Sequence, residues 1–476
     1  MSSAIPENSA PFSLAEVAKL CGGTLHGADV TTVGVSSDSR QTLGGKLFVA
    51  LRGERFDGHE FARKAAEAGA GGVLIERDLG GLPIPSVRVK STLDALGKLG
   101  QAHRKRWHGK IVAVAGSAGK TTTRSAIAAV LCSLGADAVH YAAGNLNNLI
   151  GVPMVLLGLE ARHTLGLVEI GTNARGEVGT LSALSEPDLA VLTMIGVEHS
   201  EGLGELDQIE QEEGQIWHGL RATGTAIVNA DDPRVLRTLS GARTSRRMSY
   251  GRATNAQYQL LERSSAVGGS RLRVERDTAY ARDVIELEVP LLGEAGAYAT
   301  LAAVAVAEDI CQRALEPRQI SEALRAAGEP GRLTPIELRD EIMLLDDSYN
   351  SNPASMTSSL DVAQELAQAR RARLVLVLGE MRELGALSER MHRETARKIA
   401  ELRPGLLVAV SGDARYFAQA EQEPPIETHF AEAPEGALEI LLERVLARDV
   451  VLVKASRGVH AERIVEGLVR ARGLAA

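Results

Sequence analysis

The stretch VAGSAGKTTTR, residues 114–124, has residue types and a spacing that suit the binding of a phosphate chain. Gly116 and Gly119 let the backbone come close to an anion, and Lys120 can reach the outer phosphates. The hydroxyl of Thr121 is a ligand that Mg²⁺ accepts. Position 114 is Val where the eight-residue form of this loop has Gly, so the stretch is a shorter variant. The alternative is a glycine-rich turn with a solvated lysine.

Such a loop needs a buried strand before it and a helix after it. Residues 111–115 form a short apolar run, typical of a parallel strand, and apolar residues at helical spacing follow in 120–134. The helix N-terminus then adds its dipole to the backbone N–H groups that face the anion. The residues expected at the nucleotide are Gly116, Ser117, Ala118, Gly119, Lys120, Thr121 and Thr122.

Short apolar runs alternate with helical stretches along the chain, which predicts right-handed βαβ units and parallel sheets. Residues 248–292 are strand-like but more polar. Two polar or turn-rich segments, at 103–110 and 328–335, divide the pattern. We therefore predict an α/β protein with three α/β domains. They are an N-terminal domain at 1–108, a central domain with a parallel sheet of the P-loop ATPase type at 109–328, and a C-terminal Rossmann-like domain at 329–476.

Composition limits the partners. The net charge of the 476 residues is −8, whereas nucleic-acid-binding domains are normally basic, so we expect no nucleic acid. The basic run Arg104–Arg106 is expected at a solvated helix end. Three cysteines lie far apart without metal spacing, as is usual in a reducing cytoplasm. We find no apolar run of membrane-helix length and no signal peptide, and therefore expect a cytoplasmic protein without membrane insertion.

Several further stretches accompany the phosphate loop in a fixed order. They are DSRQTLGGKLFVALRGERFDGHEFARKAAEAGA at 38–70, GNLNNLIGVP at 144–153, EIGTNARGEVGTLSALSEPDLAVLT at 169–193, HSEGLGELDQI at 199–209, LDDSYNSNPASM at 345–356, VLGEMRELG at 377–385 and VKASRG at 453–458. In this order and spacing they resemble the Mur ligase family, and the resemblance covers nearly the whole chain.

The resemblance implies an ADP-forming ligase of peptidoglycan synthesis that uses ATP and Mg²⁺. The γ-phosphate of ATP would pass to the terminal carboxylate of a UDP-MurNAc-tripeptide bound by the N-terminal domain. The amino group of D-alanyl-D-alanine would then attack the acyl phosphate. We expect a monomer. Two alternatives stay open: a Mur-like ligase with a different acceptor or amino donor, and a nucleotide-binding paralogue without catalytic activity.

The resemblance also assigns roles to single residues. Lys120 would lie on the β- and γ-phosphates, Arg332 would reach a phosphate, and Asp347 the ribose hydroxyls. The implied ligands of Mg²⁺ are Thr121, Glu169 and His199, of which His199 would hold a second ion. The residues implied for the UDP-sugar, its peptide or the dipeptide are Asp38, Ser39, Arg40, Asn147, Asn148, Asn350, Asn352, Ser456 and Arg457. From composition alone, Asp38–Arg40 and 144–148 are ordinary turns.

Four places depart from the family pattern, and Met194 and Glu380 are the two smaller changes. Glu213 stands where the family has a lysine whose carbamate helps to hold Mg²⁺. We interpret Glu213 as a built-in substitute for that carbamate, and the alternative is a solvated acidic run. The expected catalytic residues are therefore Lys120, Glu169, His199 and Glu213. Small residues replace the side chains that the family places near adenine, so the base needs other contacts. These small residues are Ala295, Gly296 and Ala299.

Overall fold

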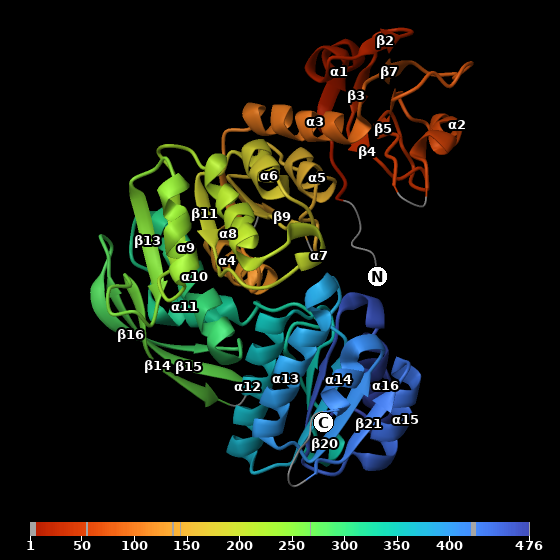
Figure 1. The fold of residues 1–476 in the computed structure, drawn as a ribbon. Helices are drawn as coiled ribbons and strands as arrows, with labels where there is room; N and C mark the ends of the chain where they lie inside the picture. The colour runs from red at the N-terminus through yellow and green to blue at the C-terminus, as the bar shows by residue number, and fades with distance from the viewer. Residues whose placement is uncertain are drawn as a thin grey trace.

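The computed structural model describes residues 6–53, 56–135, 138–142, 144–266, 268–419 and 425–475. Figure 1 shows three α/β units in chain order, from red and orange through yellow and green to blue. Each unit has a main sheet of its own, so the predicted fold class is confirmed. The predicted domain boundaries stay a prediction. None of the helices in the described ranges combines the length and the apolar character that a membrane crossing needs.

The N-terminal unit is built on a five-stranded sheet in the order β2-β7-β6-β5-β4, in which only β2 is antiparallel to its neighbour. Helix α3 leads out of this unit and packs against α5 and α6 of the next one (Figure 1). The elements are β1 (Pro11–Ser13), α1 (Leu14–Cys21), β2 (Thr24–His26), β3 (Thr31–Val33), β4 (Val35–Ser36), β5 (Leu47–Val49), α2 (Ala62–Glu67), β6 (Gly72–Ile75), β7 (Ser86–Arg88) and α3 (Thr92–Arg106).

The central unit carries a nine-stranded sheet in the order β16-β15-β14-β13-β12-β11-β8-β10-β9. Its strands are β8 (Lys110–Ala115), β9 (Val139–Tyr141), β10 (Leu165–Glu169), β11 (Leu189–Leu192), β12 (Thr225–Asn229), β13 (Arg246–Gly251), β14 (Tyr258–Ala266), β15 (Gly269–Asp277) and β16 (Arg282–Val289). Its helices are α4 (Lys120–Gly135), α5 (Gly151–Leu157), α6 (Glu177–Ser185), α7 (Ser200–Leu203), α8 (Leu206–Glu213), α9 (Pro233–Thr238), α10 (Gly293–Cys311) and α11 (Pro317–Leu324).

Strand β8 explains the continuous apolar run at 111–115. Val112 and Val114 lie in the core that includes α4 and α10, whereas Ile111, Ala113 and Ala115 lie in the core on the opposite face. Side chains of a strand alternate between the two faces of its sheet. A parallel strand with helices on both faces therefore needs an apolar residue at every position.

Strands β14 to β16 extend the parallel sheet in an antiparallel manner. In β15 the buried Leu272 and Val274 belong to the core with α10, whereas the alternating Arg271 and Arg273 are exposed. One face of this extension therefore meets solvent, as is common in antiparallel sheets. The strand-like, more polar character expected for 248–292 is confirmed.

The C-terminal unit has a six-stranded sheet in the order β17-β18-β22-β19-β20-β21, in which only β17 is antiparallel to its neighbour. Its strands are β17 (Thr334–Glu337), β18 (Met343–Asp347), β19 (Leu374–Gly379), β20 (Leu406–Val410), β21 (Thr428–Ala431) and β22 (Val450–Lys454). Its helices are α12 (Pro353–Arg370), α13 (Ser388–Leu402), α14 (Arg415–Ala418), α15 (Pro434–Arg444) and α16 (Glu462–Arg472).

The basic run at the end of α3 does not lie wholly in solvent, and for Arg104 the prediction is wrong. Arg104 is only 1% exposed. Its guanidinium donates to the carbonyls of Ser185, Trp107, Gly109 and Glu186 and to the carboxylate of Asp188. A buried guanidinium is tolerated when its donors are satisfied and its charge is paired. The polar segment at 103–110 therefore anchors the N-terminal unit to the central one.

The central and C-terminal units also touch away from the linker that joins them. Figure 1 shows the end of β14 beside α12. Arg263 donates from Nη1 to Oε2 of Glu365 at 2.9 Å, and Ser265 Oγ donates to the same oxygen at 3.0 Å. The antiparallel extension thus reaches the C-terminal unit directly.

Candidate active site

The phosphate loop follows β8 and leads into α4, as the sequence predicts. Gly116 and Gly119 have φ of 125° and 82°, in the region that favours glycine. A Cβ on Gly116 would lie 2.2 Å from Oγ1 of Thr193, so this position has no room for a side chain. The N–H of Ser117 donates to the carbonyl of Met194 at 2.8 Å, which fixes the loop to the segment that follows β11.

Lys120 begins α4 and its side chain folds back over the loop. Its Nζ donates to the carbonyl of Gly116 at 2.5 Å and lies 3.3 Å from Oε1 of Glu198. Burial lowers the pKa of Lys120, but Glu198, Glu213 and Glu169 together raise it above its ordinary value. The ammonium group therefore lies beside the Glu198 carboxylate and feels the charges of Glu213 and Glu169, at the place where phosphate oxygens are expected.

Glu169 ends β10 and lies at the same sheet edge as the phosphate loop. Its Oε1 accepts from Thr121 Oγ1 at 3.2 Å and from Asn147 Nδ2 at 2.9 Å. Its Oε2 accepts from Arg124 Nε at 3.1 Å. The structure thus brings together Thr121, Glu169 and Asn147, although the sequence places Asn147 with the substrate. Because parallel strands present their carboxyl ends at one edge, residues far apart in sequence converge here.

Glu213 is the last residue of α8 and is fully buried. Neither of its carboxylate oxygens has a hydrogen-bond partner among the described residues. Burial raises the pKa of Glu213, while the attraction of Lys120 lowers it. Burial likewise raises the pKa of Glu198; Lys120 opposes this and repulsion from Glu213 adds to it. Glu213 is therefore in the site and not on a solvated acidic run.

His199 lies at the N-terminus of α7 in the left-handed region, with φ 46° and ψ 31°. A residue with a Cβ is rarely held there unless its surroundings fix it. Here its Nδ1 pairs with the carboxylate of Glu383 from the C-terminal unit, and its Nε2 lies 3.8 Å from Oε2 of Glu198. Next to it, Ser200 Oγ donates to the carbonyl of Leu384 at 2.9 Å. His199 is thus fixed between two units.

A cavity of about 920 Å³ lies between the central and C-terminal units. Its walls include the loop residues Ala118 and Gly119, then Thr122 and Arg332, and Asp347 at the end of β18. Such a volume suits a nucleotide, since ligand pockets typically measure about 300–1,000 Å³. The small side chains at the start of α10 line the same cavity, namely Ala295, Gly296 and Ala299.

Arg332 and Asp347 both line this cavity and differ in their contacts. Arg332 Nη2 donates to Thr121 Oγ1 at 3.3 Å, and its guanidinium lies 4.3 Å from the ring centroid of Tyr349. Asp347 is buried and its Oδ2 accepts from Lys454 Nζ at 2.6 Å. Its Oδ1 accepts from the N–H of Leu333 at 3.1 Å. Asp347 therefore has a structural part in the C-terminal unit besides any part in nucleotide binding.

A second cavity, of about 190 Å³, opens beside His199. It collects most of the residues that the sequence assigns to the peptide or dipeptide in this region, namely Asn350, Asn352, Ser456 and Arg457. Asn352 also donates from Nδ2 to the carbonyl of Ser117 at 3.1 Å, which ties the start of α12 to the phosphate loop. The C-terminal unit thus contacts the phosphate loop and also supplies most of the lining of a separate recess.

The remaining sequence candidates lie apart from these cavities. Asp38 holds Arg40 through two bonds of 2.8 Å on the surface of the N-terminal unit, with Ser39 between them. Asn148 accepts from the N–H of Gly151 at 2.8 Å and so caps α5. Both arrangements match the turn alternatives that the sequence offers. The structure does not bring these residues to Lys120.

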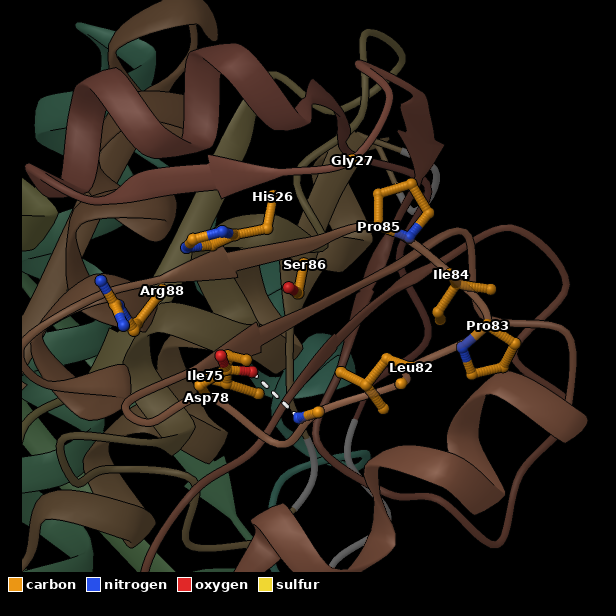
Figure 2. A pocket seen from close by; sticks show the side chains of 12 residues that line it. His26, Gly27, Ile75, Asp78, Leu82, Pro83, Ile84, Pro85, Ser86 and Arg88 are labelled. Atoms are coloured by element: carbon orange, nitrogen blue, oxygen red, sulfur yellow. Dashed lines mark hydrogen bonds between the residues drawn. The ribbon is translucent and has the colours of Figure 1, made fainter.

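The N-terminal unit has a cavity of its own, of about 440 Å³. Figure 2 shows His26, Ser86 and Arg88 on the neighbouring strands β2 and β7, across from Leu82 and Ile84 on the loop that precedes β7. None of Asp38, Ser39 and Arg40 lines this cavity. It is therefore separate from the segment that the sequence assigns to the UDP-sugar.

The residues around Lys120 fit a divalent cation of the Mg²⁺ type. Mg²⁺ is held in such sites by one or two carboxylates together with substrate phosphates and water. Glu213 supplies buried carboxylate oxygens without partners in the described part of the chain, and Glu169 and Thr121 add oxygen ligands. In the described ranges, no three His, Cys, Asp or Glu side chains are grouped closely enough to hold a metal by themselves. Phosphate oxygens would complete the coordination.

Sequence reasoning missed three charged residues of the site. Glu198 contacts Lys120, Arg124 contacts Glu169, and Glu329 contacts Arg124. Arg124 stands three residues after Thr121 in the same helix, which was a usable signal because residues three apart share a helix face. Glu198 and Glu329 depend on long-range packing and carry no local signal.

Comparison with known proteins supports the same assignment of the whole chain. Three sequence models of one family match in chain order: the Mur ligase family catalytic domain at 31–104, the Mur ligase middle domain at 114–307, and the Mur ligase, glutamate ligase domain at 331–457. UDP-N-acetylmuramoyl-tripeptide–D-alanyl-D-alanine ligase of Escherichia coli (strain K12) is 34% identical over 467 residues, covering 96% of this chain and 98% of that protein. The enzyme of the same name from Bacillus subtilis (strain 168) is 31% identical, with coverages of 92% and 93%.

Solved structures agree with these relatives. A crystal structure of MurF from Acinetobacter baumannii superimposes with a TM-score of 0.86 at 28% identity, covering 97% of this chain and 99% of that one. The MurF ligase of Thermotoga maritima in complex with ADP shares the fold, with a TM-score of 0.81 and coverages of 92% and 97%. Because these similarities extend over the full chain and agree with its three units and its phosphate loop, the chain belongs to the Mur ligase family.

Proposed function

We propose that the protein is an ATP-dependent, ADP-forming ligase that joins D-alanyl-D-alanine to a UDP-MurNAc-tripeptide in peptidoglycan synthesis. The observation that carries the proposal is the full-length similarity to ligases of this name, 34% identical over 467 residues. The geometry adds support, because a nucleotide-sized cavity beside the phosphate loop and a smaller recess beside His199 both lie between the central and C-terminal units. The reaction that the family resemblance implies needs room for a nucleotide and a dipeptide, and the two cavities offer it.

The residues of the chain divide the work of the reaction. The N–H groups of 116–120 and the ammonium of Lys120 bind the phosphates of ATP, and Arg332 adds a cation from the C-terminal side. The terminal carboxylate of the tripeptide attacks the γ-phosphorus, which releases ADP and forms an acyl phosphate. Bound Mg²⁺ would neutralise charge on the phosphates, held by Thr121, Glu169, His199 and Glu213.

The second half-reaction makes the amide bond. The amino nitrogen of D-alanyl-D-alanine attacks the acyl carbon, loses a proton, and inorganic phosphate leaves. We place the dipeptide in the recess of Asn350, Asn352, Ser456 and Arg457, which lies beside His199. We place the UDP-sugar on the N-terminal unit at Asp38, Ser39 and Arg40, with Asn147 and Asn148 on the path between. Enclosure between two units excludes water that would hydrolyse the acyl phosphate.

Glu213 is the residue whose role differs from the family pattern. We propose that its carboxylate replaces the carbamate of the family's lysine and holds Mg²⁺ without CO₂. Its support is a fully buried carboxylate that makes no hydrogen bond of good geometry to the described residues. Burial raises the pKa of this carboxyl, and Lys120 and the neighbouring N–H of Gly116 lower it. Glu213→Ala is expected to abolish ligation, and added bicarbonate is expected to leave the wild-type rate unchanged. Strong activation by bicarbonate would contradict the proposal.

The start of α10 offers the nucleotide base no polar side chain, although Asn229, Asp231 and Tyr298 line other parts of the same cavity. Ala295, Gly296 and Ala299 line the cavity and have no side-chain donors or acceptors. Discrimination between bases is strong only where buried polar groups of the site pair with the correct base. With the base against the start of α10, we expect GTP to support ligation within about tenfold of ATP. A preference for ATP above a thousandfold would show that other groups read the base.

One assay tests the proposed function. Purified protein is incubated with ATP, Mg²⁺, D-alanyl-D-alanine and a UDP-MurNAc-tripeptide with either lysine or diaminopimelate at the third position. The expected result is ADP and a UDP-MurNAc-pentapeptide in equal amounts. ADP formation only with another amino donor or acceptor would favour the related ligase, and binding of nucleotide without turnover would favour the non-catalytic paralogue. Cytoplasmic location and a monomeric state stay predictions.

A further inference from the structure

Arg124 occupies an unusual place between the candidate metal ligand and the start of the C-terminal unit. It lies on α4 and is only 2% exposed. Its Nε donates to Oε2 of Glu169 at 3.1 Å, its Nη1 donates to the carbonyl of Ala142, and its Nη2 pairs with the carboxylate of Glu329. One guanidinium thus joins two carboxylates that belong to different parts of the chain.

Glu329 belongs to the linker between α11 and β17. In this linker Gly328, Gly331 and Leu333 have φ of 128°, 75° and 52°, so the chain changes direction several times. The carbonyl of Glu329 accepts from the N–H of Arg332 at 3.1 Å, and Arg332 in turn reaches Thr121. Glu329 therefore connects the linker to Glu169 through Arg124 and to Thr121 through Arg332.

Charge balance gives this arrangement a consequence. A permanently charged guanidinium beside Glu169 competes with a cation for the same carboxylate. Glu329 shares that positive charge, which leaves Glu169 more of its negative charge, while Arg124 still fixes the direction of the Glu169 oxygens. Groups that orient metal ligands typically change metal affinity by about 10–100-fold when they are removed.

We propose that Arg124 is a positioning residue that couples the linker of the C-terminal unit to the Glu169 carboxylate, and that Glu329 is its partner. The inference deepens the proposed function, because it rests on Glu169 as a ligand of Mg²⁺. When the C-terminal unit moves, Glu329 moves with the linker, and the charge that Arg124 presents to Glu169 changes. The position of the C-terminal unit thereby changes the affinity of the site for Mg²⁺.

The test measures Mg²⁺ binding to the full-length protein in the presence of ADP by calorimetry, without peptide substrates and therefore without turnover. Glu329→Gln is expected to raise the apparent Kd for Mg²⁺ about tenfold, and Glu329→Asp, which keeps the charge, is expected to restore most of it. In the double variant with Arg124→Gln, the additional effect of Glu329→Gln is expected to disappear, because the residues act as one unit.

Ser125→Ala is the matched control. Ser125 follows Arg124 and also bonds the linker, since its Oγ donates to the carbonyl of Gly328 at 3.2 Å and accepts from its N–H at 2.9 Å, but Glu169 is not among the partners of its hydroxyl. Its Kd for Mg²⁺ is expected to equal that of the wild type. A Glu329→Gln protein with wild-type Mg²⁺ affinity and only a lower melting temperature would overturn the inference. The inference would also fail if the fold-change in Kd of the double variant equalled the product of the two single fold-changes.

The outcome is separable from that of the ligase assay. Mg²⁺ and ADP binding needs neither the tripeptide nor the dipeptide. A protein that makes no pentapeptide but loses Mg²⁺ affinity in Glu329→Gln would refute the proposed function and support the coupling. If the wild type makes pentapeptide and Glu329→Gln binds Mg²⁺ with unchanged affinity, the proposed function is supported and the coupling is refuted.

Discussion

Two adjacent glutamates in α8 allow a sharp test of what a buried charge does in this protein. Glu212 and Glu213 are 2% and 0% exposed. Glu212 accepts from the N–H groups of Gly176 at 2.6 Å and Val178 at 2.8 Å, at the start of α6. Glu213 makes no hydrogen bond of good geometry within the described residues, although the charge of Lys120 and the neighbouring N–H of Gly116 oppose the rise of its pKa that burial causes. The same substitution, glutamate to glutamine, should therefore have opposite effects at the two positions.

For Glu213→Gln we expect a more stable protein when Mg²⁺ is absent. The change removes a buried carboxylate without partners, a group whose burial costs about 1–3 kcal/mol. The new amide can also donate to the nearby Glu198. For a unit of about 200 residues, this stabilisation raises the melting temperature by roughly 2–12 °C. Ligation should fall at least about tenfold, because a metal ligand is lost.

For Glu212→Gln we expect the reverse. The amide has one oxygen instead of two, so one of the backbone N–H groups at the start of α6 loses its charged acceptor. Such bonds contribute about 1.5–3 kcal/mol each, and the melting temperature should fall accordingly. The assay is thermal unfolding followed by circular dichroism in EDTA, with both variants beside the wild type. If Glu213→Gln destabilises the protein as Glu212→Gln does, Glu213 makes structural bonds and the reasoning fails.

Further predictions concern single residues of the fold and the loop. Lys454→Met leaves the buried Asp347 carboxylate without its cation, so urea unfolding should show about 3–5 kcal/mol less stability, and adding Asp347→Asn should recover much of it. Gly116→Ala should abolish nucleotide binding in calorimetry, because its Cβ would lie 2.2 Å from a threonine hydroxyl, whereas Gly241→Ala has open space and should bind normally. Asp57 accepts from a histidine and an arginine, and its backbone and side-chain bonds lower its pKa. Its stabilisation is therefore present above the ordinary aspartate value of about 3.9 and is lost as the pH falls further. The gap in melting temperature between the wild type and Asp57→Asn should accordingly shrink as the pH falls below about 4.

The parts of the site that the sequence predicts are those that local chemistry encodes. Lys120 and Thr121 follow from a glycine loop between an apolar strand and a helix, and β8 follows from apolar residues at every position. Glu198 lies 78 residues from Lys120, and Glu329 lies 205 residues from Arg124. Their contacts depend on how the units pack, and no local pattern records that. Composition rules fail for the same reason at Arg104, whose burial is compensated by carbonyls from distant segments.

The contact between the antiparallel extension and α12 limits how the C-terminal unit can turn. When the cavity opens and the contacts at His199, Ser200 and Asn352 separate, that unit stays attached at the linker around Gly328 and where Arg263 meets Glu365. A body held at one point can pivot in any direction, whereas a body held at two points rotates about the line that joins them. Opening of the nucleotide cavity is therefore a door-like swing with one axis as long as the Arg263–Glu365 pair holds, and freer tumbling requires that pair to break.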